Sequence, residues 1–170
     1  MVMGAAAVEP SRADAAWAVL SGVMDPEIPV VSVVDLGIVR EVREEGGELE
    51  VIITPTYTGC PATKQIEFDV RLALDKGGFE DAALSIALAP AWSTDWITEK
   101  GRAELKAFGI APPEGAATSK RELFSGDRNV QCPHCGARDT EMVSEFGSTA
   151  CKSLWRCRSC REPFDYFKCI

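Results

Sequence analysis

The stretch VIITPTYTGCPAT, residues 51–63, decides the fold of the first two thirds of the chain. Its first residues are β-branched and apolar and give way to a Thr-Pro pair, which predicts a strand that ends there. Pro61 suits the first turn of a helix, so we expect a helix to begin directly after Cys60. The sulfur of Cys60 would then lie at the helix N-cap, where the helix dipole and unpaired N–H groups lower a thiol pKa.

Before this stretch, the pattern predicts one helix and two antiparallel strands. Ser11 can cap a helix that runs to about Gly22, since apolar residues recur there every three or four positions. Apolar and polar residues alternate around 38–43, and the polar turn EEGG at 44–47 connects them to a second alternating run at 49–53. These features indicate a β-hairpin.

After this stretch, the pattern predicts a helix, a strand and a helical segment. Apolar residues recur every fourth position from Ile66 to Leu74, before the glycine pair 77–78 that stops the helix. A strand is expected at about 82–89, and a short helix or turn followed by a second helix at 93–109. The order of elements indicates an α+β domain, in which helices cover a small mixed sheet.

The chain of 170 residues has room for one ordinary domain and a small appendage. We expect an N-terminal tail at 1–10, the α+β domain at 11–113, a Pro, Gly and Ala-rich linker at 114–129, and a zinc ribbon at 130–170. No apolar run approaches the ~18 residues of a membrane span, and the first residues lack a secretory signal. A cytoplasmic protein is therefore expected.

The cysteines near the C-terminus carry the most specific signal in the sequence. Two C-x2-C pairs, separated by 21 residues, can form two knuckles that hold a metal ion between four thiolates: Cys132, Cys135, Cys157 and Cys160. One structural Zn²⁺ per chain is the expected occupant, with an iron–sulfur cluster on the same ligands as the alternative. Cys151 and Cys169 remain, and Cys151 could either pack as a small apolar side chain or assist metal transfer.

The composition excludes several kinds of chemistry. His134 is the only histidine and should point out of its knuckle, so His-based nucleophile triads and His-bound catalytic metal sites are excluded. No Gly-rich phosphate loop of the common spacings appears. Residues 1–129 contain 12 basic and 21 acidic residues, which disfavours binding to nucleic acid. Carboxylates and Cys60 remain as the groups that could carry chemistry.

Cys60 has two interpretations that the residue pattern leaves open. A thiolate at a helix start is a nucleophile and a ligand for soft metals, so Cys60 is a candidate site for iron or a cluster. The alternative is a small side chain buried between strand and helix. Asp25 and Glu27 could place carboxylates near the thiol, although Asp-Pro is also a turn signal, and Asp35 has the same ambiguity.

The segments DPEIPVVSVVDLGIV, TPTYTGCP and PAW resemble the small domain of SufT-type proteins and cytosolic iron–sulfur targeting factors. With FGSTACKSLWRCRSCREPFDYFKCI included, nearly the whole chain resembles the PaaD family, accessory subunits encoded with the phenylacetyl-CoA epoxidase of phenylacetate degradation. The positions that match the family's motifs are Asp25, Pro26, Glu27, Asp35, Gly37, Thr56, Gly59 and Cys60.

The resemblance implies maturation of the epoxidase, with Cys60 as ligand for transient iron or an iron–sulfur cluster and with Asp25 and Glu27 in support. The implied clients are the ferredoxin-type reductase subunit or the di-iron oxygenase subunit. One thiolate cannot complete a cluster that takes four cysteines, so a client, a small thiol or a second protomer in a homodimer must supply the rest. The alternative is a docking subunit, held by exposed aromatics of the ribbon: Trp155, Phe164, Tyr166 and Phe167.

Overall fold

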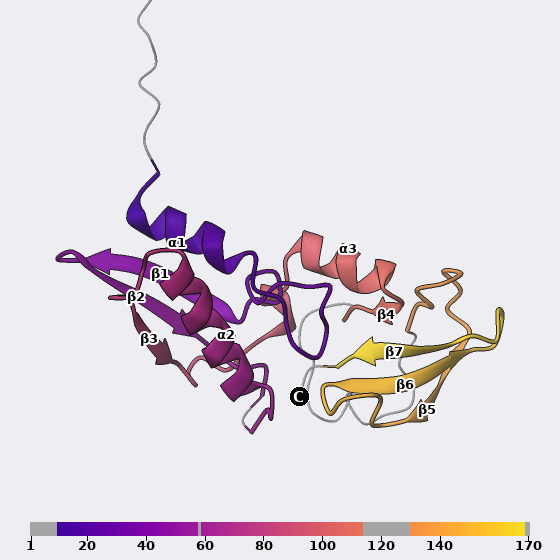
Figure 1. Cartoon of the computed structure of the whole chain (residues 1–170). Coiled ribbons are helices and arrows are strands. Elements are labelled where there is room, and N and C mark those ends of the chain that lie inside the picture. The colour runs from indigo at the N-terminus through magenta and orange to yellow at the C-terminus, as the bar shows by residue number, and fades with distance from the viewer. Residues whose placement is uncertain (1–9, 58, 114–129, 169–170) are drawn as a thin grey trace, which may run out of the picture.

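The computed structural model describes residues 10–57, 59–113 and 130–168. The expected linker at 114–129, nearly all of the expected tail and Cys169 lie outside the described residues. Figure 1 shows an elongated molecule with a three-stranded sheet and two helices at one end and a four-stranded sheet at the other, with α3 (Glu99–Ala107) between them. The prediction of an α+β fold followed by a zinc ribbon is confirmed in its architecture.

The first helix, α1 (Arg12–Leu20), begins where the sequence predicts. Ser11 is the N-cap, and its hydroxyl accepts a hydrogen bond from the Asp14 N–H while the Asp14 carboxylate accepts from the Ser11 N–H. This reciprocal capping box satisfies two donors that a helix start otherwise leaves unpaired. Ala16 and Leu20 are fully buried, so one face of α1 belongs to the core.

The predicted hairpin is formed by β1 (Val39–Glu45) and β2 (Glu48–Ile53), and β3 (Ala83–Ile86) pairs with β2 in parallel. The mixed sheet has the order β1-β2-β3. Gly46 and Gly47 connect the hairpin strands, each at the positive φ that favours glycine.

The third strand is shorter than the expected 82–89, because β2 cannot pair beyond its end. The Ala87 N–H donates to the Ile53 carbonyl at 2.9 Å, and the next ladder bond would need an N–H at Pro55, which proline lacks. Leu88, beyond this point, is exposed.

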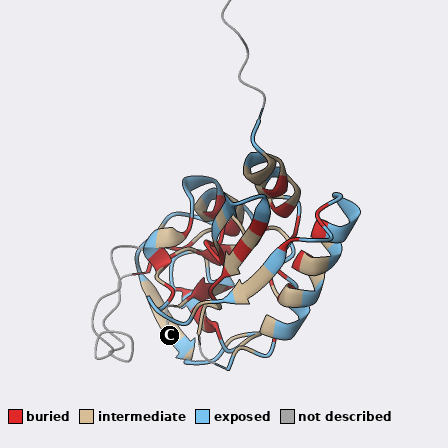
Figure 2. Cartoon of the chain, turned by 90° about the vertical axis from the view of Figure 1, so that its left-hand side faces the viewer, coloured by how far each residue is buried: buried red, intermediate tan, exposed pale blue. Residues whose placement is uncertain are grey.

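The second helix, α2 (Thr63–Lys76), crosses over from β2 to β3 and ends at Gly77, as predicted. Its apolar positions Ile66, Val70 and Leu74 are buried in one cluster with the inward side chains of β2. Figure 2 shows this buried layer between the helices and the sheet. The alternation of apolar residues in β2 and their recurrence every fourth residue in α2 predict that one face of the strand packs against one face of the helix.

The segment 93–109 contains the 3-10 helix η1 (Thr94–Trp96) and then α3 (Glu99–Ala107), again as predicted. Thr98 caps α3, since its hydroxyl accepts from the Gly101 N–H. Gly101 is buried against the backbone of Asp35, and a Cβ atom at Gly101 would meet the Asp35 carbonyl oxygen at 2.7 Å. The glycine that lowers helix propensity here allows a close approach of two backbones.

The ribbon is formed by β5 (Thr140–Ser144), β6 (Lys152–Cys157) and β7 (Pro163–Phe167), which pair antiparallel in that order. A further short strand, β4 (Ile110–Ala111), pairs in parallel with β7 and completes the sheet order β4-β7-β6-β5. Because β4 directly follows α3, the ribbon's sheet includes a strand from the segment expected to belong to the α+β domain.

The expectation that the ribbon exposes its aromatic side chains is wrong. They are between 1% and 5% exposed: Trp155, Phe164, Tyr166 and Phe167. The first three form the ribbon's own core, whereas Phe167 belongs to the core of the α+β part and lies edge-to-face against Trp92, with ring centroids 5.9 Å apart. Aromatic side chains bury large apolar areas, so these four pack inside the chain and are not exposed for a partner.

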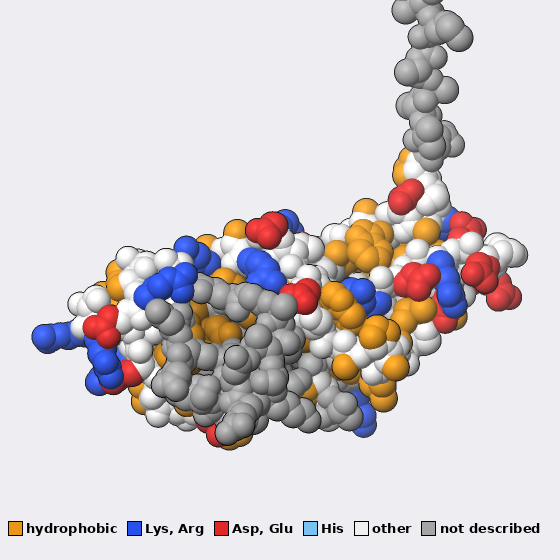
Figure 3. Space-filling model, turned by 180° about the vertical axis from the view of Figure 1, so that it is seen from behind, with side chains coloured by type: hydrophobic (Ala, Val, Ile, Leu, Met, Phe, Trp, Pro, Cys, Tyr) orange, Lys and Arg blue, Asp and Glu red, His pale blue; other side chains and the backbone are white. Residues whose placement is uncertain are grey.

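The described residues show neither a long apolar helix nor, on the face in Figure 3, a surface of one charge. Within the described residues, no helix is long and apolar enough to cross a membrane. On the face in Figure 3, outside the grey atoms, acidic and basic side chains are interspersed with hydrophobic ones and form no continuous basic stripe.

Candidate metal centres

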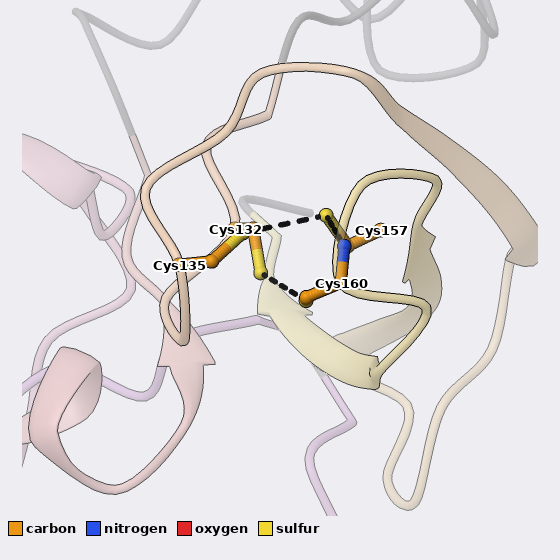
Figure 4. A group of neighbouring side chains, drawn as sticks. All are labelled: Cys132, Cys135, Cys157 and Cys160. Atoms are coloured by element: carbon orange, nitrogen blue, oxygen red, sulfur yellow. Dashed lines mark hydrogen bonds between the residues drawn. The ribbon is translucent and has the colours of Figure 1, made fainter.

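The four ribbon cysteines converge on one point, as Figure 4 shows. Their sulfur atoms all lie within 4.8 Å of one another, and no other group of three or more His, Cys, Asp or Glu side chains in the described chain does so. The sulfurs of Cys132 and Cys160 are 3.8 Å apart, and those of Cys135 and Cys157 are 3.6 Å apart.

These distances fit one tetrahedral ion. Four sulfurs that each bind zinc at about 2.3 Å lie about 3.8 Å apart at the corners of a tetrahedron. A cubane cluster needs its four thiolates further apart, because irons and sulfides lie between them. The donor set and its spacing therefore match the closed site of a zinc ribbon and leave no position for a substrate.

Two tight turns position these ligands. The Gly136 N–H donates to the Cys132 carbonyl at 2.9 Å, and Gly136 takes a positive φ of 77°. In the second turn the Cys160 N–H donates to the Cys157 sulfur at 3.5 Å. That hydrogen bond is the largest factor that lowers the pKa of Cys157 to about 6, which favours the thiolate that a metal requires.

His134 is not among the converging ligands, in agreement with the prediction. Its ring lies near Gly109 at the end of α3, where a Cβ atom at that glycine would meet the imidazole carbon Cε1 at 3.0 Å. The knuckle thus contacts the α+β part of the chain through this side chain.

Cys60 lies two residues before the N-cap of α2, so the prediction that it occupies the N-cap is wrong. The N-cap is Ala62, whose carbonyl accepts the first helical bond from the Ile66 N–H at 2.9 Å. The Cys60 carbonyl instead accepts from the Thr63 N–H at 3.2 Å and closes a turn. This turn uses Pro61 and Ala62, the residues that we expected in the first helical turn.

The side chain of Cys60 is partly exposed and faces a pocket. Polar or thiol-bearing residues that line this pocket are Asp25, Glu27, Thr56, Cys60, Thr63 and Cys151. The structure therefore brings together the thiol and the two carboxylates that the sequence predicted as its neighbours. Gly59, directly before Cys60, has a φ of 91° and no atom within 4 Å of a built Cβ, so the backbone there is open.

The two carboxylates differ in what they contact. Asp25 is buried, and its Oδ1 accepts hydrogen bonds from the N–H groups of Glu27 and Ile28, both at 2.8 Å. Burial raises the pKa of Asp25, and these two N–H donors oppose the rise. Glu27 points to another thiol, since its Oε2 accepts from the Cys151 sulfur at 3.5 Å. Asp25 thus shapes the turn, whereas the Glu27 carboxylate is directed toward a thiol of the pocket.

Cys151 is the residue of this pocket that the sequence alone did not place. It lies just before β6, is buried, and contacts the Thr149 hydroxyl at 3.0 Å as well as Glu27. Desolvation raises its pKa to about 11. The sequence did mark Cys151 as a thiol that the four ribbon ligands do not need. It gave no sign that Cys151 lies near Cys60, because 91 positions separate the two residues.

Asp35 has a structural role. Its carboxylate accepts hydrogen bonds from Ser32, Thr98 and Lys100 at 2.7 to 2.8 Å. These contacts join the loop before β1 to the start of α3. Asp35 thus connects two segments that are distant in the sequence, and its carboxylate does not line the Cys60 pocket.

Two family models match separate parts of the chain. Residues 13–84 match the family of iron–sulfur cluster assembly proteins, and residues 116–168 match the PaaD zinc beta ribbon domain. A crystal structure of a domain of unknown function, DUF59, from Bacillus anthracis is 29% identical, with a TM-score of 0.50, over 55% of this chain and 90% of that one. Fold and sites define an iron–sulfur assembly-type domain joined to a zinc ribbon.

The chain belongs to the PaaD family. It is 46% identical to an Escherichia coli K12 protein named as the D subunit of a "putative 1,2-phenylacetyl-CoA epoxidase", over 97% of this chain and 98% of that protein. A Porphyromonas gingivalis protein named "Fe-S protein maturation auxiliary factor" is 36% identical over 51% of this chain and 83% of its own length.

Proposed function

We propose that this protein is an accessory maturation factor of a phenylacetyl-CoA epoxidase system and carries out no catalysis of its own. It holds iron or an iron–sulfur cluster at Cys60 and passes it to a partner subunit in phenylacetate degradation. The clients that fit such cargo are the ferredoxin-type reductase subunit and the di-iron oxygenase subunit. The names of its relatives support this assignment, since one is an epoxidase subunit and another an Fe-S maturation factor.

The observation that carries the proposal is the pocket at Cys60. Its sulfur is partly exposed, and carboxylates from Asp25 and Glu27 line the same space. Thiolate and carboxylate groups bind ferrous iron, and an incomplete ligand set leaves positions to which a client can bind during transfer. A site for storage would instead need a closed ligand set like that of the ribbon.

The ribbon site has a structural role in this proposal. One Zn²⁺ held by the four ribbon cysteines stabilises a module that has a small core of its own. With all four coordination positions filled by protein, this ion takes no part in transfer.

The test compares wild-type protein with Cys60→Ser after anaerobic purification. We expect iron and sulfide in the wild type and their loss in the variant, with the zinc content unchanged. In cells, the variant should leave the client subunit without its iron or cluster. Zinc serves as the internal control, because its loss would report a damaged fold. Full metal content of the client beside Cys60→Ser would refute the proposal.

The same experiment distinguishes a maturation factor from a docking subunit. A docking subunit would contain zinc alone in both proteins and would copurify with active epoxidase whether or not Cys60 is present. The burial of the ribbon's aromatics removes the surface on which that alternative was based.

A further inference from the structure

The pocket at Cys60 is built from two distant parts of the chain. Cys60 and Glu27 come from the α+β part, whereas Cys151 comes from the turn that leads into β6 of the ribbon. Phe167, the last residue of β7, also lines this pocket and belongs to the core of the α+β part. The pocket therefore lies at the junction of the two modules.

Two thiols and two carboxylates line this pocket, and Glu27 is the carboxylate directed toward a thiol. The Cys151 sulfur lies 3.5 Å from the Glu27 Oε2. Tyr57 lies close to both thiols: burial raises the pKa of its phenol to about 12, and interactions with Cys60, Cys151 and Glu27 contribute to the rise. The lining of the pocket places the Cys60 and Cys151 thiols and the Glu27 carboxylate around one small space.

We propose that Cys60, Cys151 and Glu27 together form a binding site for a ferrous ion. This inference rests on the proposed function and names the second thiolate and the carboxylate of the cargo site. Two thiolates and a carboxylate make three protein ligands, so at least one coordination position stays open for the client. The ribbon cysteines, in contrast, close their own site.

Binding is a ligand exchange without oxidation or reduction. Fe²⁺ loses bound water, the Cys60 and Cys151 thiols each release a proton to solvent, and the Glu27 carboxylate binds through an oxygen. The neighbours that set the charge around Cys151 are Glu27, Tyr57, Lys152 and Lys168.

The groups must move closer together when the ion binds. Their ligand atoms do not converge to within 4.8 Å of one another, as those of the ribbon cysteines do. The Glu27 side chain can rotate toward the thiols, and the backbone at Gly59 has open space around it. Movement of the Glu27 side chain and of the turn at Gly59 therefore brings the ligands together, and the buried strands stay in place.

This arrangement gives the ribbon a part in cargo binding. Cys151 immediately precedes β6, and the Lys168 N–H donates to the Cys151 carbonyl at 3.0 Å, so the ribbon's sheet fixes its position. The zinc centre then acts on the cargo site indirectly, because it stabilises the sheet that holds the second thiol.

The test uses the full-length, zinc-loaded protein and Co²⁺ as a spectroscopic substitute for Fe²⁺. Thiolate-bound Co²⁺ gives near-ultraviolet charge-transfer absorption that grows with the number of thiolates. We expect Cys151→Ser and Cys151→Ala to lose about half of this absorption and to bind Co²⁺ at least about tenfold more weakly, since removal of a ligand costs no less than removal of its supporting partner. Cys60→Ser should lose a similar share.

The matched control is Ser148→Ala, three positions before Cys151, whose hydroxyl binds Asp165 and does not line the pocket. It should bind Co²⁺ like the wild type. Cys151→Ala keeps a small apolar side chain, so it separates a ligand from a packing residue. Zinc content and near-ultraviolet circular dichroism check that each variant is folded.

The outcomes separate this inference from the proposed function. Weak binding in Cys60→Ser beside wild-type binding in both Cys151 variants would overturn the inference and leave the proposed function standing. Wild-type binding in all of these variants would overturn both. If a Cys151 variant loses its zinc, X-ray absorption of Fe²⁺ bound to the wild type decides: two sulfur ligands are expected, and a single sulfur ligand would overturn the inference.

Discussion

At the scale of single residues, Asp25 is expected to cost stability at neutral pH. Burial raises its pKa in the folded protein above the ordinary value, so the folded state binds a proton more readily than the unfolded chain. The ionised carboxylate is therefore destabilising above the folded pKa, and this penalty disappears as the pH falls below the unfolded pKa. Asn at this position can still accept both N–H donors.

We predict that Asp25→Asn is more stable than wild type at pH 7 by on the order of 1 kcal/mol and that this gain vanishes in acid. Thermal unfolding at a series of pH values measures the difference. An Asn variant that is less stable at pH 7 would show that the charge is compensated, for example by Lys152, which lowers the same pKa.

At the scale of elements, α3 depends on a residue that disfavours helices. Replacement of glycine by alanine in an exposed helix interior stabilises by up to about 1 kcal/mol. At Gly101 the added Cβ would meet the Asp35 carbonyl oxygen at 2.7 Å, so we predict that Gly101→Ala destabilises the protein by about 1–3 kcal/mol. Urea unfolding monitored by circular dichroism gives the value.

The control for this prediction is Gly22→Ala, just after α1. A Cβ at Gly22 would have only an ordinary contact, 3.4 Å from the Val19 carbonyl oxygen, so the change should be close to neutral. Equal effects at both glycines would mean that α3 can shift away from the Asp35 backbone at little cost.

At the scale of the whole molecule, the two modules should unfold together. The β4 strand follows α3 and pairs with β7, and Phe167 packs against Trp92 in the core of the α+β part. Zinc-binding modules gain on the order of 10 kcal/mol from the ion, so we predict one calorimetric transition whose midpoint a chelator lowers by about 10 °C or more. A transition of the α+β part at an unchanged temperature after chelation would contradict this coupling.

Local patterns predicted most elements because each carries its own physical signal. The capping box at Ser11, the glycine pair of the hairpin and the apolar stripe of α2 depend on neighbours within a few residues. Two errors arise where partners are distant: the end of β3 depends on Pro55, just after β2, and the burial of Phe167 depends on Trp92. The error at Cys60 is local, because Pro61 and Ala62 form a turn before α2 begins.

The sequence by itself determined the spacing of the four ribbon cysteines and the order of elements in the α+β part, since spacing and turn chemistry are local properties of the chain. Only the tertiary structure decided that Cys151 and Glu27 line the pocket of Cys60, and that β4 completes the ribbon's sheet. No local signal encodes the approach of residues separated by 91 positions, because packing of the entire core brings them together.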